Sequence, residues 1–163
     1  VLIPNLKVVF CGTAVGNESA KRKAYYAGIG NQFYTILFKS GFTPFVLNPE
    51  DYKKLIAYKI GLTDLAKNTS GNDSDLNPED YDVNGFRNKI LQYKPKWICF
   101  NGKEAARIYF KLKSTKDINY GIQKEQLGAT KIYVAPSTSA QARKYWDETY
   151  WKQLKSFSDN EKI

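Results

Sequence analysis

Short runs of apolar residues, many of them β-branched, alternate along the chain with segments of helical periodicity. Three such runs are Leu6–Cys11, Trp97–Asn101 and Lys131–Ala135, and each gives way to small or polar residues. Continuous apolar runs of this length are typical of strands buried on both faces, as in parallel sheets. We therefore predict three buried parallel strands, and Phe45–Leu47 is predicted as a short additional edge strand.

The segments between these runs repeat apolar residues every three to four positions, which is the spacing of an amphipathic helix. Gly41 has the place of a helix C-cap, and Asn48-Pro49-Glu50 has the composition of a helix start. Strands that alternate with helices predict an α/β fold, a three-layer α/β/α arrangement with a mostly parallel central sheet of about four to five strands. The predicted helices are Asn31–Ser40, Asn84–Tyr93, Lys103–Leu112 and Asp147–Phe157.

The length of 163 residues favours a single domain over residues 1–163. The net charge of +9 favours a polyanionic partner such as DNA, RNA or an acidic membrane surface, and a charged surface that only confers solubility is the alternative. No apolar run approaches the length of a membrane span, and the first residues lack the features of a signal peptide. We therefore expect a cytoplasmic protein.

The residue types that are present limit the chemistry. The chain has no histidine, which excludes Ser-His-Asp and Cys-His mechanisms and the commonest zinc sites. Any general base must be an aspartate, glutamate, lysine or tyrosine. Cys11 and Cys99 end apolar runs, so we expect buried free thiols there and neither a disulfide nor a metal site.

Ligands of open parallel sheets bind at the carboxyl ends of the strands. The segment Thr63–Pro78, TDLAKNTSGNDSDLNP, is a polar interruption of the strand and helix pattern, and long loops of this kind are usually functional or mobile. Four segments therefore compete for the site: Gly12–Asn31, Asp64–Asp75, Asn101-Gly102-Lys103 and Pro136–Arg143.

The first of these segments is the most informative. The turn from Gly12 to Gly16 has small side chains, which let a ligand approach the backbone closely. Tyr25 and Tyr26 follow the cations at 21–23, a pairing of flat rings and positive charge that nucleic-acid sites use. An ordinary turn with a solvated basic face is the alternative interpretation.

Together the four segments resemble the uracil-DNA glycosylase superfamily, and most closely its mismatch-specific uracil/thymine branch. The resemblance covers nearly the whole chain and keeps the order of five motifs. These are Gly12-Thr13-Ala14-Val15-Gly16, the run from Tyr26 to Phe33, Gly61-Leu62-Thr63-Asp64, Phe100-Asn101-Gly102-Lys103 and Pro136-Ser137-Thr138-Ser139-Ala140. It implies a monofunctional DNA glycosylase of base excision repair that extrudes uracil and hydrolyses its N-glycosidic bond, in G·U mismatches or single strands, without a metal or cofactor.

One departure from the family pattern concerns the catalytic residue. Ala14 stands where the first motif normally carries an asparagine that is thought to position the attacking water. The chain is similar to a bacterial sub-branch in which an aspartate of the polar loop supplies the base. The resemblance implies Asp73 in this role, with Asp64 and Asp75 as its rivals, and an ordinary Asx-turn at Asp73 is the alternative.

The resemblance also implies binding residues. Gly12, Thr13 and Ala14 would read the edge of the extruded base, and Tyr26, or alternatively Tyr25, would stack on it. Asn31 would hold the base or the water, or would only cap the next helix. Gln141 is a candidate wedge for the gap in the helix. The expected DNA contacts are Lys21, Arg22, Lys23, Lys103, Ser137, Thr138, Ser139, Ala140, Gln141 and Arg143, with Lys144 next in line.

The expected partner is uracil-containing DNA, bound by a monomer near the bacterial nucleoid. Two other functions compete with this one. A non-catalytic nucleic-acid-binding module would keep the pocket after losing the asparagine. A nucleotide-binding Rossmann-like protein is disfavoured, since the turn at Gly12 is not G-x-G-x-x-G and no acidic residue follows at the expected spacing.

Overall fold

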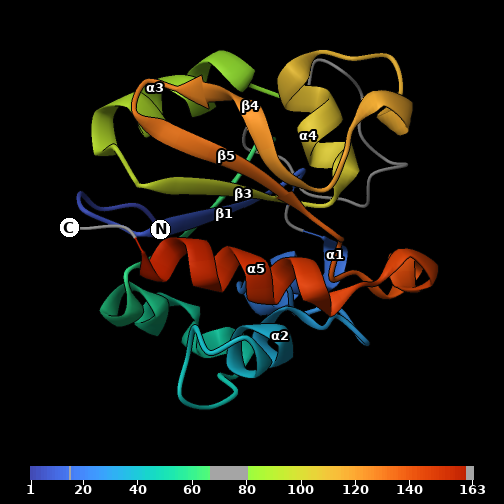
Figure 1. Ribbon diagram of the computed structural model, residues 1–163. Helices are drawn as coiled ribbons and strands as arrows, with labels where there is room; N and C mark the ends of the chain where they lie inside the picture. Colours follow the sequence, from blue (N-terminus) through green and yellow to red (C-terminus); the bar gives the residue numbers. More distant parts are fainter. Residues whose placement is uncertain (15, 67–80, 161–163) are drawn as a thin grey trace.

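A computed structural model describes residues 1–14, 16–66 and 81–160 of the chain. Within them five strands form one sheet in the order β2-β1-β3-β5-β4, in which β4 alone is antiparallel to its neighbour (Figure 1). The four parallel strands therefore present their carboxyl ends at one edge of the sheet. The strands are β1 (Val8–Gly12), β2 (Ile60–Asp64), β3 (Trp97–Asn101), β4 (Gly121–Leu127) and β5 (Thr130–Ala135).

Helices cover both faces of the sheet, with α2 and α5 on one side and α3 and α4 on the other (Figure 1). Along β1 the side chains alternate between these layers, so that Phe10 packs with the first set of helices and Val9 with the second. The helices are α1 (Asn17–Arg22), α2 (Phe33–Lys39), α3 (Val83–Tyr93), α4 (Lys103–Phe110) and α5 (Glu148–Asp159), with 3-10 turns η1 (Pro49–Tyr58), η4 (Thr115–Asp117) and η5 (Ala140–Tyr145).

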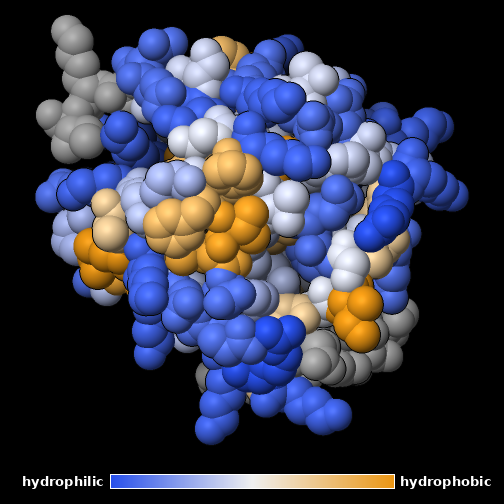
Figure 2. Space-filling view, turned by 90° about the horizontal axis from the view of Figure 1, so that it is seen from below, coloured by the Kyte–Doolittle hydropathy of each residue, from blue (hydrophilic) through white to orange (hydrophobic). Residues whose placement is uncertain are grey.

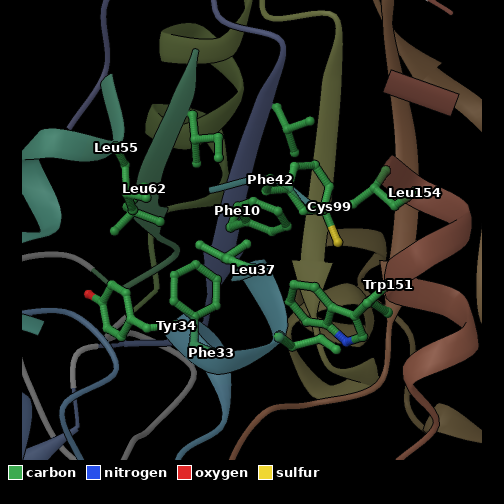
Figure 3. Close-up of a cluster of buried hydrophobic side chains, with 14 of the residues drawn as sticks. Phe10, Phe33, Tyr34, Leu37, Phe42, Leu55, Leu62, Cys99, Trp151 and Leu154 are labelled. Atoms are coloured by element: carbon green, nitrogen blue, oxygen red, sulfur yellow. The ribbon is translucent and has the colours of Figure 1, made fainter. Parts of the chain in front are cut away.

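Aromatic rings fill the layer between the sheet and α2 and α5. The ring of Phe10 stacks on Trp151 of α5, with the centroids 5.4 Å apart, and meets Phe33 of α2 edge-on at the same distance (Figure 3). All three side chains are fully buried. Because Phe33 is the first residue of α2, this core also fixes the loop that precedes it.

The predicted fold class is confirmed, and so are the three predicted buried strands and the helices between them, with ends that differ by one or two residues. Gly41 follows α2 with a φ of +90°, as expected of a residue just past a helix end. The prediction of a strand at Phe45–Leu47 is wrong. That segment forms no ladder, and Phe45 and Val46 are half exposed while Leu47 alone is buried.

Two strands, β2 and β4, were not among the predicted ones. The sequence of β2 is short and ends in polar Thr63 and Asp64, which the pattern assigned to the polar loop. β4 contains four consecutive polar residues, because it is an edge strand whose middle faces solvent. Neither strand carries the continuous apolar run on which the other predictions depended.

Both cysteines are buried free thiols, as predicted, and burial raises their pKa values well above the ordinary range. Among the described residues, no helix has both the length and the apolar character needed to cross a bilayer. The face seen from below is mostly hydrophilic, with one group of apolar side chains at its centre and left and a smaller, separate one on the right (Figure 2). Exposed apolar residues of α2 and the following loop are Phe38, Phe45 and Val46.

Candidate functional site

A cavity of about 560 Å³ opens at the carboxyl ends of the parallel strands. It lies where the strand order reverses, because the chain leaves β1 toward β2 on one side while β3 lies on the other, and ligands of such sheets bind at this point. Each of the four strand-end segments contributes described residues to its wall. They include Gly12, Thr13, Ala14, Tyr25, Tyr26, Asn31, Asp64, Asn101, Lys103, Ser137, Thr138, Ser139 and Gln141.

The floor of the cavity is the turn after β1. Gly12 is the register partner of Asp64, and the backbone amides of Leu65 and Ala66 donate to the carbonyl oxygens of Gly12 and Thr13 at 3.1 and 2.8 Å. A Cβ at Gly12 would lie 3.3 Å from both the Asp64 Oδ1 and the Tyr26 hydroxyl oxygen. A side chain at position 12 would therefore crowd both polar groups. Because both oxygen atoms lie 3.3 Å from the same point, the Asp64 carboxyl and the Tyr26 hydroxyl lie close to each other in the cavity.

Asp64 is the last residue of β2, and its carboxyl group lines the cavity. Burial raises its pKa from the ordinary value of 3.8 to about 7. A buried acid in a cleft that titrates near neutral pH has the character of a functional group. Of the three predicted catalytic candidates, Asp64 is the one that the structure describes, while Asp73 and Asp75 lie outside the described residues.

Tyr26 forms the wall next to Asp64. Its backbone is left-handed, with a φ of 55°, and its ring packs on Phe33 with the centroids 4.1 Å apart. The hydroxyl oxygen is buried and has no hydrogen-bond partner among the described residues, while the nearby Asn101 amide favours the ionised form. Burial, and then the charge of Asp64, raise the pKa of the phenol well above its usual range, so it stays a neutral donor.

Tyr25, the alternative stacking residue, lines the same cavity, and the centre of its ring lies 6.3 Å from that of Tyr26. Its ring meets Tyr52 edge-on at 5.2 Å, and its carbonyl oxygen accepts a hydrogen bond from the Tyr34 hydroxyl at 2.7 Å. Asn31 also lines the cavity, and its Oδ1 accepts a hydrogen bond from the Phe33 amide at 2.9 Å. Asn31 directly precedes Gln32, the N-cap residue of α2, so this bond is an Asx turn that leads into the helix and not an N-cap bond.

A pair of hydrogen bonds joins the end of β3 to the loop that follows β5. The Asn101 amide nitrogen donates to the Thr138 hydroxyl at 2.9 Å, and the Thr138 backbone amide donates to Asn101 Oδ1 at 3.0 Å. Thr138 is fully buried, so it supports this loop from inside, while Ser137 and Ser139 line the cavity beside it. Asn101 thus holds the predicted DNA-contacting loop in place.

The predicted DNA contacts differ in their surroundings. Lys21, in the last turn of α1, and Lys23, directly after it, are exposed. Arg22 is ion-paired with Glu50 and also donates to the Ala27 carbonyl oxygen at 3.1 Å. A phosphate contact by Arg22 would have to compete with these bonds. Lys103 lies in the cavity wall with its Nζ 4.5 Å from the centre of the Tyr120 ring.

The remaining predicted contacts lie in η5 and the turn before it. Ser139 caps η5, since its hydroxyl oxygen accepts from the Gln141 amide at 3.3 Å. Ala140 and Gln141 are exposed, and Lys144 lies over the Tyr145 ring at 5.0 Å. Arg143 donates to the Gly30 carbonyl oxygen at 3.3 Å, which joins this segment to the loop before α2.

Several wall residues carry no motif in the sequence. Thr115 and Tyr120 come from the connection between α4 and β4, and Tyr145 ends η5. Nothing in their local pattern distinguishes them from surface residues, and only the packing of the α4–β4 connection and of η5 against the strand ends brings them here. In the part of the chain that the structure describes, no three His, Cys, Asp or Glu side chains are grouped so as to hold a metal ion.

Comparisons with known proteins point in one direction. The family model described as the uracil DNA glycosylase superfamily matches residues 2–159. Among solved structures, the chain is similar to the solution NMR structure of a "putative Uracil DNA glycosylase" from Methanosarcina acetivorans, with 21% sequence identity and a TM-score of 0.64. The match covers 98% of this chain and 94% of that one, and at this identity it establishes the fold alone.

Proposed function

Because the chain belongs to the uracil DNA glycosylase superfamily, we propose that it is a monofunctional DNA glycosylase that removes uracil from DNA by hydrolysing its N-glycosidic bond. G·U mismatches and uracil in single strands are the proposed substrates. The observation that carries the proposal is the cavity at the strand ends, where a neutral phenol and a buried carboxyl group face the small-residue turn after β1.

The cavity has the chemistry that glycosidic cleavage needs. The sugar gains oxocarbenium character and the leaving base gains negative charge in the transition state. Backbone groups at Thr13 and Ala14 and the ring of Tyr26 would bind the base edge and its face. Lys103 would add positive charge to the side of the cavity that it lines.

A carboxylate must take over the task of the missing asparagine at position 14. We propose Asp73 for this task, since the polar loop supplies the base in the sub-branch that the sequence resembles. Asp64 is the alternative, supported by its place in the cavity and its pKa of about 7, which suits a general base at neutral pH. In either case the carboxylate would stabilise the sugar cation and orient the attacking water.

The proposed reaction is tested with uracil-containing oligonucleotides, single-stranded and in G·U duplexes, followed by alkali to cut the abasic product. We expect strand breaks only after alkali, because a monofunctional enzyme leaves the abasic site intact. Asp73→Asn is expected to lower the rate by about 10²- to 10⁴-fold, the usual range for a general base. If Asp64→Asn abolishes the rate while Asp73→Asn stays within a few-fold of wild type, Asp64 is the base.

Ala14 favours a second candidate function, a nucleic-acid-binding module without catalysis, because its methyl group cannot orient water. This function predicts binding of uracil-containing DNA without any strand scission after alkali. If the protein binds uracil-containing DNA but releases no uracil from any substrate, the result supports the binding module and contradicts the enzyme.

A further inference from the structure

Ile29 is the most exposed of the large apolar side chains that the structure describes as exposed, with 95% of its surface open to solvent. Tyr145 follows with 59%. Tyr145 lines the cavity, and the backbone of Ile29 belongs to the cavity rim, since Ile29 directly follows the lining residue Gly28 and comes two positions before the lining residue Asn31. The other exposed apolar residues, such as Ile122 of the edge strand β4, do not line the cavity.

The loop that carries Ile29 is a tight turn braced from two sides. The Asn31 amide donates to the Gly28 carbonyl oxygen at 3.1 Å, and Gly30 has a φ of +80°, which favours glycine at this place in a turn. The Gln32 amide donates to the Thr138 carbonyl oxygen at 2.9 Å. The position of the Ile29 side chain outside the protein is therefore set by backbone hydrogen bonds.

The same turn is joined to the segment after β5, which carries several of the predicted DNA contacts. A Cβ at Gly30 would lie 3.1 Å from the Ala140 Cβ and 3.2 Å from the Arg143 Nη2, and this arginine donates to the Gly30 carbonyl oxygen. Ile29 thus stands on a braced turn, directly before the residue that the Arg143 guanidinium contacts. A fixed, uncovered apolar side chain between a base-sized cavity and positive charge fits a stack of bases rather than water.

We propose that Ile29 is the wedge of this protein: it enters the DNA base stack where the uracil nucleotide has left and keeps the gap open. The inference rests on the proposed glycosylase function and assigns a residue to the extrusion step. Insertion of apolar side chains between base steps is an established way to hold an opened duplex. This assignment differs from the sequence-based expectation that Gln141 is the wedge, since the polar side chain of Gln141 lies in the cavity wall.

The test uses Ile29→Ala, Ile29→Leu and, as a matched control, Ile122→Ala, which removes the same atoms from an exposed position outside the cavity. Single-turnover rates are measured on the same uracil strand alone and in a G·U duplex. A single strand has no stack to hold open, so a wedge matters only in the duplex. We expect Ile29→Ala to slow duplex excision by about 10-fold or more, which corresponds to a loss of at least about 1.4 kcal/mol of stabilisation of the opened duplex.

Single-strand excision is expected to stay within two-fold of wild type for all three variants, and Ile29→Leu is expected to restore the duplex rate. Gln141→Ala is expected to change the ratio of the two rates little. The inference is overturned if Ile29→Ala slows both substrates equally, if it changes neither, or if only Gln141→Ala alters the ratio.

These outcomes are separate from a failure of the proposed function. If wild type releases no uracil from either substrate, the glycosylase proposal fails before the variants are compared. In that case fluorescence of 2-aminopurine opposite the uracil still tests the wedge, since Ile29→Ala should remove any rise that wild type causes and Ile122→Ala should not. No rise with wild type would overturn the wedge as well.

Discussion

At the scale of single residues, the cavity depends on how burial changes the chemistry of ordinary side chains. Asp64 and Tyr26 both present oxygen atoms to the Gly12 backbone, and both have raised pKa values because they are removed from water. An exposed aspartate would be fully ionised at neutral pH, while Asp64 is partly protonated there. The same residue type is thus a fixed anion on the surface and a titrating group in this cavity.

Asp64 should make the stability of the fold depend on pH. In the unfolded chain it loses its proton near pH 3.8, whereas the folded protein keeps the proton until about pH 7. The free energy of unfolding therefore falls as pH rises from about 4 to 7 and is level above that. Asp64→Asn, which cannot titrate, is expected to stabilise the fold more at pH 8 than at pH 5, and the two stabilisations should differ by about 3 kcal/mol, since about two pH units separate pH 5 from the folded pKa.

Urea unfolding of wild type and Asp64→Asn at both pH values measures this difference, with Asp117→Asn as the control at an exposed position. An equal stabilisation by Asp64→Asn at pH 5 and pH 8 would mean that Asp64 is ionised in the folded protein throughout.

At the scale of elements, α5 connects the aromatic core to the loop that borders the cavity. The indole nitrogen of Trp151 donates to the Pro136 carbonyl oxygen at 3.0 Å, at the point where β5 gives way to the Ser137–Ser139 turn. The ring of Trp151 is fully buried against Phe10. One side chain therefore fixes both the helix on the sheet and the start of the predicted DNA loop.

Trp151→Phe should keep most of the ring packing and remove this hydrogen bond, which leaves a buried carbonyl oxygen without its donor. We expect the free energy of unfolding to fall by about 1–3 kcal/mol plus the cost of the smaller ring. Chemical denaturation measures it, and Trp146→Phe, in a half-buried neighbour, is the control. A loss no larger than that of Trp146→Phe would show that the bond to Pro136 contributes little.

At the scale of the whole molecule, the net charge of +9 bears on how DNA would be bound. Binding by phosphate contacts weakens with salt in proportion to the number of counterions released. Lys103 lies in the cavity wall, whereas Lys96 is exposed at the amino end of β3, on the opposite edge of the sheet. The two lysines carry the same charge but only one lies on the proposed DNA side.

We expect Lys103→Gln to reduce the slope of log affinity against log salt concentration by about 1 for an unmodified duplex, and Lys96→Gln to leave it unchanged. Fluorescence anisotropy between low and moderate salt measures the slopes. Equal slopes for the two variants would indicate that the DNA is held by overall charge and not by this face.

Much of the architecture follows from local patterns, and each wrong or missing strand prediction has its own physical cause. The apolar runs of β1, β3 and β5 predicted strands because they are buried on both faces, and the helices showed their apolar periodicity. β4 was missed because an edge strand needs no apolar run, and Phe45–Leu47 was wrongly predicted because a short apolar stretch can cover a core without pairing.

The sequence by itself determined the α/β class, the four strand-end segments that compete for the site, and the absence of a polar side chain at position 14 in the first motif. Only the tertiary structure decided that Asp64 lies beside Gly12 through the β1–β2 register and is buried there, that Asn101 holds Thr138, and that Ile29 projects from the rim. The reason is physical. Periodicity reports which side of an element is buried, whereas pKa values, neighbours and exposure depend on distant segments that packing brings together.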